Sequence, residues 1–176
     1  SHKSPSQKAC EADLRKLMVS VLQSDFPLLA ACYMGIVVEA AGGTLDRKHP
    51  EVIGAYEINL TAEGADDAVM ANIPDNFLAF SGHKESVCLK PPGSIVLASS
   101  KACPFHMLRI KNNIYACQFH PELDNEGLAL RVEIYKHHGY FPPEAADELI
   151  AEAARHGVDE PVKIIRNFVN IYSKSF

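Results

Sequence analysis

The sequence lacks several features that would assign it at once to a large class of proteins. No apolar run approaches the roughly 20 residues that a membrane-spanning helix needs. Positive charge is not in excess, since 17 Lys and Arg stand against 22 Asp and Glu and give a formal net charge of -5. No basic cluster, internal repeat, low-complexity segment or ATP-binding loop is present. We therefore expect a protein that binds neither membranes nor nucleic acid.

The cysteines also lack a pattern, because the chain has five of them, an odd number, without the spacing of a disulfide framework. Reduced thiols in a cytoplasmic setting fit this composition best. The chain has 176 residues, of which 47% are hydrophobic and 22% charged. That length and composition are typical of one globular domain that can bury a core.

The first third of the chain predicts a helix, a strand and a second helix. Ser4-Pro5-Ser6-Gln7 has the N-cap, first-turn proline and capping-box residue of a helix start, and apolar residues then recur on one face up to about residue 24. A short apolar run over residues 27–31 indicates a buried strand. Residues 34–41 predict a helix that ends at Gly42-Gly43.

The rest of the chain alternates between strand and helix patterns. Strands are predicted at residues 56–60, 77–80, 95–98, 105–110 and 114–119, the last two joined as a hairpin. Helices are predicted at residues 67–73, 125–138, 143–157 and from about 161 onward, whereas 44–50 indicate a polar connection. This order predicts an α/β fold, with a mostly parallel central sheet and helices on both faces.

Cys32 stands where the first strand turns into the second helix. The N-terminal end of a helix carries unpaired N–H groups and partial positive charge, which favour a thiolate over a thiol. The thiolate is the nucleophilic form. The alternative is a small cysteine that packs in the core as a hydrophobic residue, which is the commoner role of cysteine.

A second motif, Gln118-Phe119-His120-Pro121-Glu122, follows the hairpin. Residues i and i+2 of an extended segment point the same way, so Glu122 can hold the imidazole of His120 from behind. Cysteine, histidine and an orienting carboxylate are the minimum set for thiol acyl-transfer chemistry. The two motifs together therefore predict Cys32, His120 and Glu122 as a catalytic triad.

These two stretches resemble the class I (triad) glutamine amidotransferases, and most closely the GMP-synthase-like glutamine amidotransferase domains. In that family a cysteine on a sharp strand-to-helix turn is served by the His and Glu of a Q-F-H-P-E-like motif. The resemblance implies a flavodoxin-like layering of the fold. It also implies that Cys32 attacks the side-chain amide of glutamine and forms a thioester, that His120 moves the protons, and that Glu122 orients His120.

The resemblance also implies where glutamine binds. The backbone N–H of Tyr33 is expected to form half of the oxyanion hole. The stretch Ser81-Gly82-His83-Lys84-Glu85-Ser86 resembles the loop that the family places near the α-amino and α-carboxylate groups, so His83, Lys84 and Glu85 are predicted substrate-binding residues.

The same resemblance implies the partners. Glutamine is the predicted substrate, and a separate synthetase subunit is the predicted acceptor of ammonia; no cofactor is expected, and a homodimer stays open. Two alternative functions are compatible with the sequence. The chain could hydrolyse a γ-glutamyl peptide or another amide, or it could be a catalytically silent binding domain.

Three departures from the family pattern bear on these alternatives. The family turn reads Gly-x-Cys-x-Gly, whereas this chain has Ala30 and Met34 at the glycine positions and Gly35 one place late, so we expect backbone strain at Met34. Residues 37–39 hold no counterpart of a substrate-contacting glutamine. We also expect residues 1–176 to be a single amidotransferase-like domain without the family's N-terminal βαβ portion, which carries the other oxyanion donor.

A zinc site was the remaining candidate. Cys103-x-x-His106 and Cys117-x-x-His120 have zinc-like local spacing. If each pair lies on a strand, its two residues point to opposite faces and cannot converge on one ion. On this reasoning we expect no metal site.

Overall fold

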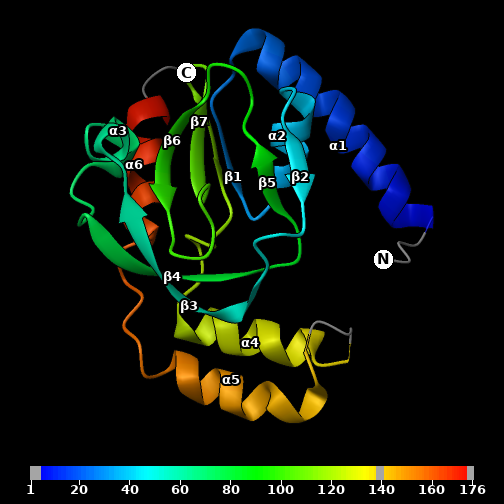
Figure 1. The fold of residues 1–176 in the computed structure, drawn as a ribbon, viewed down its shortest axis with the longest axis vertical. Coiled ribbons are helices and arrows are strands. Elements are labelled where there is room, and N and C mark those ends of the chain that lie inside the picture. The colour runs from blue at the N-terminus through cyan, green and yellow to red at the C-terminus, as the bar shows by residue number, and fades with distance from the viewer. Residues whose placement is uncertain (1–4, 138–140, 174–176) are drawn as a thin grey trace.

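A computed structural model describes residues 5–137 and 141–173. Its strands are β1 (Leu28–Ala31), β2 (Thr44–Asp46), β3 (Glu51–Leu60), β4 (Asn76–His83), β5 (Ser86–Leu89), β6 (Ile95–Ser99), β7 (Met107–Ile110) and β8 (Ile114–Cys117). Its helices are α1 (Pro5–Ser24), α2 (Met34–Ala40), α3 (Ala62–Ala65), η1 (Ala68–Met70), α4 (Asn125–Tyr135), η2 (Pro143–Ala145), α5 (Ala146–Ala153) and α6 (Val162–Tyr172). Figure 1 shows these elements as a curled sheet between helices.

The six-stranded sheet has the order β1-β8-β7-β6-β3-β4, and β2 pairs with β5 in a separate small sheet. Only β1 and β8 pair in parallel among the described strands, and the other pairs are antiparallel. The expectation of a mostly parallel sheet was therefore wrong, although the α/β class is confirmed. The reason is local: the three-residue turn 111–113 joins β7 to β8, and a short hairpin turn can connect only antiparallel strands.

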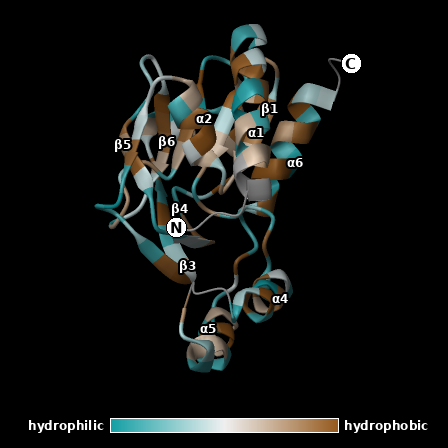
Figure 2. Ribbon diagram, turned by 90° about the vertical axis from the view of Figure 1, so that its right-hand side faces the viewer, coloured by the Kyte–Doolittle hydropathy of each residue, from teal (hydrophilic) through white to brown (hydrophobic). Residues whose placement is uncertain are grey.

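Helices cover both faces of the sheet, as expected (Figure 1). Alternate residues of β8 show this directly, because successive side chains of a strand point to opposite faces. Tyr115 and Cys117 pack in a cluster with Ile164 of α6. Ile114 and Ala116 pack in another, with α1 and α2. Apolar residues, brown in Figure 2, lie on β6 and α2.

A helical pair forms the lower part of the molecule in Figure 1, where α4 and α5 lie beside β3 and β4. Phe80 of β4 is fully buried against this pair, together with Leu128 and Val132 of α4. This contact fixes one side of α4 relative to the end of β4. It thereby places α4 beside the pocket described below.

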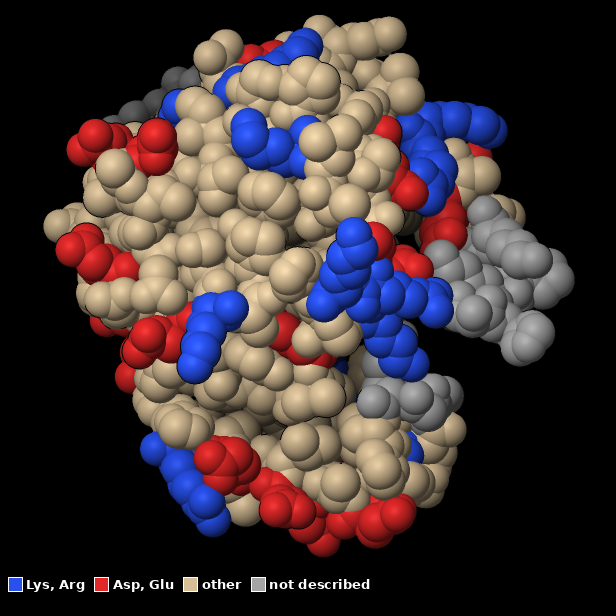
Figure 3. Space-filling view, in the orientation of Figure 1, with Lys and Arg blue, Asp and Glu red and all other residues tan. Residues whose placement is uncertain are grey.

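The boundaries predicted from the sequence differ from the structure in a few places. β2 lies inside the stretch expected to be a polar connection, and the helix expected over residues 67–73 is the single turn η1. The first helix begins at Pro5 as predicted, while its N-cap Ser4 lies outside the described residues. No helix in residues 5–137 and 141–173 is both long and apolar enough to cross a membrane. On the face shown in Figure 3, basic and acidic side chains are intermixed.

Candidate active site

The turn between β1 and α2 holds Cys32 in a left-handed backbone conformation, with φ of 61°. This region costs a non-glycine residue roughly 1–2 kcal/mol and is held only where neighbouring contacts enforce it. Two such contacts are present. The N–H of Cys32 donates to the carbonyl of Cys117 at 2.9 Å, and the N–H of Tyr33 donates to the carbonyl of Ala31 at 2.7 Å.

The expected strain at Met34 was wrong, because the strain lies at Cys32 instead. Met34 is the first residue of α2, does not have a positive φ, and is fully buried. Gly35 is the residue that permits close packing here: a Cβ on it would lie 2.8 Å from Cδ1 of Leu45. The displaced glycine thus serves the contact between α2 and β2 rather than the turn itself.

Tyr33 lies at the pocket, but its N–H is already engaged with Ala31. An oxyanion donor has to point at the oxygen that becomes charged. The predicted oxyanion role of Tyr33 therefore requires the short turn around Cys32 to open on substrate binding. That role stays a prediction.

His120 is placed by a backbone contact between two distant segments. Its N–H donates to the carbonyl of Phe80 at 2.8 Å, which ties the residues after β8 to β4. Its Nδ1 lies 2.7 Å from Oε1 of Glu122. The i, i+2 geometry expected from the sequence is thus present, and it leaves the other ring nitrogen for the pocket that Cys32 also lines.

Electrostatics favour a charged histidine at this place. Burial lowers the pKa of His120, but hydrogen bonds to Cys32 and Glu122 outweigh burial and raise it to about 9. Burial raises the pKa of Glu122, yet the hydrogen bond from His120 and the charge of Arg131 leave it below its ordinary value. At neutral pH the arrangement therefore favours an imidazolium between a carboxylate and the cysteine sulfur.

Arg131 was missed by the sequence analysis. One of its guanidinium nitrogens lies 3.0 Å from Nδ1 of His120 and 3.5 Å from Oε1 of Glu122. Nδ1 cannot both accept from Arg131 and donate to Glu122, and the shorter contact of 2.7 Å favours donation to Glu122. Arg131 then acts on the carboxylate. Nothing in the sequence marked this arginine, because it lies on α4, nine positions beyond Glu122 and in no motif.

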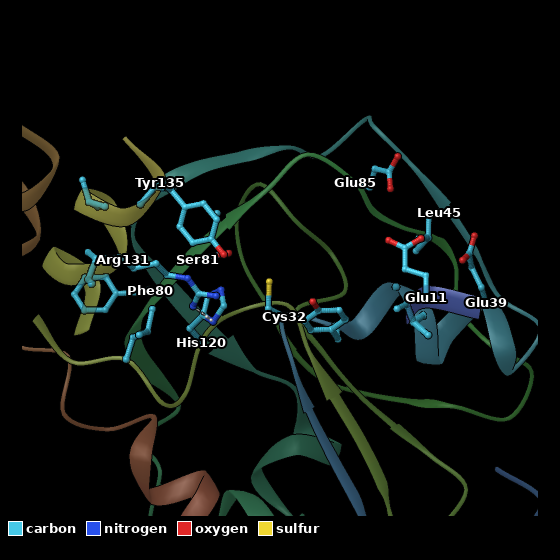
Figure 4. Close-up of a pocket in the computed structure, with 18 of the residues that line it drawn as sticks. Glu11, Cys32, Glu39, Leu45, Phe80, Ser81, Glu85, His120, Arg131 and Tyr135 are labelled. Carbon is cyan, nitrogen blue, oxygen red and sulfur yellow. Dashed lines mark hydrogen bonds between the residues drawn. The ribbon is translucent and has the colours of Figure 1, made fainter. Parts of the chain in front are cut away.

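These residues open into a pocket of about 410 Å³ between α1 and α2 on one side and α4 on the other. Figure 4 shows Cys32 and His120 at its centre. Glu11, Glu39 and Glu85 lie at one end of the pocket and Arg131 at the other. Two cations pair with this acidic end: Arg15 with Glu39 at 2.7 Å, and Arg47 with Glu85 at 3.1 Å.

The three predicted loop residues fall in different places. The strand predicted to end at residue 80 continues as β4 to His83, so only part of the predicted loop is a loop. Glu85 lines the pocket, as do Ser81 and Gly82 of β4, whereas His83 and Lys84 are not among the lining residues. The side chain of His83 is 4% exposed and bonds to the buried Glu51 at 3.0 Å. The pocket thus gives His83 no direct contact with a ligand in this structure.

The reasoning that excluded a metal was wrong for one of the two pairs. Cys103 and His106 lie in the loop before β7 and not on a strand, so alternation of side chains does not separate them. Cys103, His106 and His83 each offer one ligand atom, and the three atoms lie within 4.8 Å of one another. Cys117 and His120, by contrast, serve the core and the pocket respectively.

Comparison with known proteins shows which family the chain resembles. Residues 4–129 match the family described as glutamine amidotransferase class-I. The chain is 30% identical over 114 residues to GMP synthase [glutamine-hydrolyzing] of Lactobacillus delbrueckii subsp. bulgaricus, covering 64% of this chain and 22% of that protein. It is 29% identical over 149 residues to the enzyme of the same name from Thermomicrobium roseum, covering 82% and 28%.

A solved structure shows the same fold. The glutamine amidotransferase of Thermotoga maritima superimposes with a TM-score of 0.75 at 20% sequence identity, over 91% of this chain and 70% of that one. The chain spans only roughly a quarter of the length of the two GMP synthases, at 22% of the Lactobacillus protein and 28% of the Thermomicrobium protein.

Proposed function

Because the chain belongs to the class I glutamine amidotransferase family, we propose that its pocket binds glutamine and that Cys32 hydrolyses the side-chain amide to release ammonia. The observation that carries the proposal is the joint geometry of Cys32 and His120. Cys32 sits on a positive-φ turn, His120 is held by Glu122 at 2.7 Å, and both line one pocket.

The proposed reaction uses the His120 imidazolium described above. The Cys32 thiolate attacks the amide carbon of glutamine, and the resulting tetrahedral intermediate collapses as the C–N bond breaks. His120 gives its proton to the departing nitrogen, so ammonia leaves and a γ-glutamyl thioester remains. His120 then takes a proton from water as the water attacks the thioester, which releases glutamate and restores the thiolate and imidazolium. Glu122 keeps the ring oriented and stabilises its positive charge.

The charged residues of the pocket suit an amino-acid substrate. Glutamine carries an ammonium and a carboxylate, and the acidic end of the pocket combines Glu39 and Glu85 with their arginine partners. A zwitterion can exchange ion pairs there without leaving a charge unpaired. By analogy with relatives named GMP synthase, we further propose that the ammonia passes to a synthetase that lies outside these residues. A γ-glutamyl peptide would place the same groups at the same end, so it stays the alternative substrate.

One observation favours a catalytically silent domain instead. The N–H of Tyr33 donates to Ala31 and is not free to stabilise an oxyanion. Loss of one oxyanion donor typically lowers kcat about 10²–10³-fold. The second proposal is therefore a domain that binds glutamine without turning it over.

Release of ammonia and glutamate from glutamine separates these proposals. Cys32→Ala should lower the rate at least about 10³-fold, while the matched variant Cys88→Ala, at an exposed position of β5, should match the unmodified protein. A γ-glutamyl peptide offered in place of glutamine tests the alternative substrate. Binding of glutamine without any release of ammonia would support the silent domain.

A further inference from the structure

A second group of cysteine, histidine and glutamate lies away from the pocket and takes no part in the chemistry proposed above. Glu51 begins β3, His83 ends β4, and Cys103 and His106 lie in the loop before β7. All four side chains are buried: Cys103 and His106 are 0% exposed, and the side chains of His83 and Glu51 are 4% and 0% exposed. Polar groups buried in this way require compensating interactions, because desolvation disfavours each of them.

The ligand atoms lie close to the geometry of a metal site. One atom from each of His83, Cys103 and His106 lies within 4.8 Å of the other two. Around a tetrahedral zinc ion, with bonds of about 2.0–2.3 Å, neighbouring ligand atoms are about 3.3–3.8 Å apart. The separations in the structure, at most 4.8 Å, exceed this spacing by no more than about 1–1.5 Å.

With neutral imidazole rings, the hydrogen bonds of the two histidines are incomplete. Nε2 of His83 faces Glu51 at 3.0 Å, and Nδ1 of the same ring faces the carbonyl of Glu85 at 3.1 Å, so a neutral ring can donate to only one of two acceptors. Nε2 of His106 faces Glu51 at 2.9 Å, whereas its buried Nδ1 has no hydrogen-bond partner among the described residues. Orphaned buried polar atoms of this kind are rare.

A metal ion would complete the hydrogen bonding of the His83 ring. A metal at Nε2 of His83 leaves Nδ1–H to donate to the Glu85 carbonyl, which is the second hydrogen bond that metal-bound histidines usually keep. The Glu51 carboxylate lies beside both rings and also accepts from the Ser100 hydroxyl at 2.9 Å. That hydroxyl in turn accepts from the backbone N–H of Cys103 at 2.9 Å, so the loop is tied to Glu51.

The composition of the cluster also suits a cation. The buried carboxyl group of Glu51 lies 3.0 Å from His83 and 2.9 Å from His106, and Cys103 is fully buried beside the two rings. A divalent ion bound here would balance the charges of one thiolate and one carboxylate.

We propose that His83, Cys103 and His106, with the adjacent carboxylate of Glu51, bind one zinc-like divalent cation. The ligand set of two imidazoles, a thiolate and a carboxylate suits zinc rather than a hard ion such as Mg²⁺. The site is closed and lined by protein, so its role is structural. It fixes the end of β4, where Ser81 and Gly82 line the pocket just before Glu85.

Cobalt(II) is the probe for this site, because it replaces zinc and a thiolate ligand gives it a charge-transfer absorption. Metal-free protein titrated with Co²⁺ should bind one ion per chain with that absorption, and Zn²⁺ should displace it and raise the melting temperature. Cys103→Ser and His106→Gln should each weaken binding at least about 10-fold, and Cys103→Ser should remove the absorption. Cys88→Ser is the matched control and should change neither.

The Cys32→Ser variant tests whether the metal binds instead at the pocket, between Cys32 and His120. If the absorption disappears in Cys32→Ser and persists in Cys103→Ser, the metal binds at the pocket and the proposal is overturned. Failure of folded, metal-free protein to bind Co²⁺ stoichiometrically overturns it too, and leaves the cluster as a polar network only. If Cys103→Ser does not fold, His106→Gln decides by the same titration.

Discussion

The molecule contains two groups of the same three residue types, and they differ in access and in backbone. Cys32 and His120 line an open pocket, with Glu122 bound to the His120 ring and the cysteine on a positive-φ turn. Cys103, His106 and Glu51 are buried in the interior; the first two lie in a loop without positive φ and Glu51 begins β3. Hydrogen bonds raise the pKa of His120 to about 9 in the first group, whereas burial raises the pKa of Cys103 to about 11 in the second.

The same residue types thus form two different kinds of site, depending on their burial and hydrogen bonds. In the open group the carboxylate binds one histidine, which leaves that ring free to exchange protons with the cysteine and a substrate. In the buried group one carboxylate binds two histidines, and the side chains are almost fully shielded from solvent. The first arrangement suits proton transfer, and the second suits a fixed ion.

Replacing one histidine in each group should give the largest contrast. His120→Ala should lower the release of ammonia from glutamine by about 10²–10⁴-fold, the usual contribution of general acid–base catalysis. His106→Ala should leave turnover within about 10-fold and lower the free energy of unfolding instead, because it empties a fully buried position. Steady-state kinetics and urea unfolding of both variants check this. Equal losses of turnover in His120→Ala and His106→Ala would contradict the separate roles of the two groups.

Replacing the glutamate by glutamine in each group should lower the stability of the protein by very different amounts. Glu51→Gln removes a buried charge that holds two histidines and should lower the free energy of unfolding by roughly 3 kcal/mol. Glu122→Gln affects a side chain that is 42% exposed, so its cost should be under about 1 kcal/mol. Denaturant unfolding measures both. The comparison fails if Glu122→Gln is the more destabilising of the two.

The pH dependence of His120 should sharpen the comparison. Its pKa in the folded protein, about 9, is above the ordinary 6.5, so the stability that its proton contributes is fully present below pH 6.5 and is lost as pH rises towards 9. In Cys32→Ala the hydrogen bond to the sulfur is gone, and the pKa of His120 should fall by about one unit or more. An NMR titration of the ring proton reads this directly, and an unchanged pKa in the variant would contradict the proposed pairing.

The smallest predicted effect concerns the backbone at Cys32. Cys32→Gly and Cys32→Ala should both be inactive, but the glycine variant should be more stable by about 1 kcal/mol, since glycine adopts positive φ without the steric cost. Thermal unfolding of the two variants side by side is the measurement. Equal stability would show that the turn is not strained.

Much of the site could be predicted from the sequence because its signals are local. The strand before Cys32 and the i, i+2 spacing of His120 and Glu122 depend on neighbouring residues, and the structure contains both. The contact of His120 with Phe80 joins segments far apart in the chain, and Arg131 reaches His120 only because of how α4 packs, so no local pattern encodes either contact.

The errors have a similar cause. A mostly parallel sheet was inferred from alternating strands and helices, yet strand direction depends on connections that vary in length, and only β1–β8 is parallel among the described pairs. The metal reasoning assumed that Cys103 lies on a strand, but β7 begins only at Met107. Cys103 therefore lies four residues before β7, outside the strand, and this placement changed a conclusion about chemistry.

The most direct test of this account is the labelling of the folded protein with a chloroketone analogue of glutamine, read by intact mass and peptide mapping. The account predicts a single adduct on Cys32, slowed by glutamine and absent in Cys32→Ala, with Cys103 unlabelled until the protein is unfolded. Labelling of Cys103 in the folded protein at a rate equal to that of Cys32, or no glutamine-protected adduct at all, would contradict the division between an open reactive site and a buried structural one.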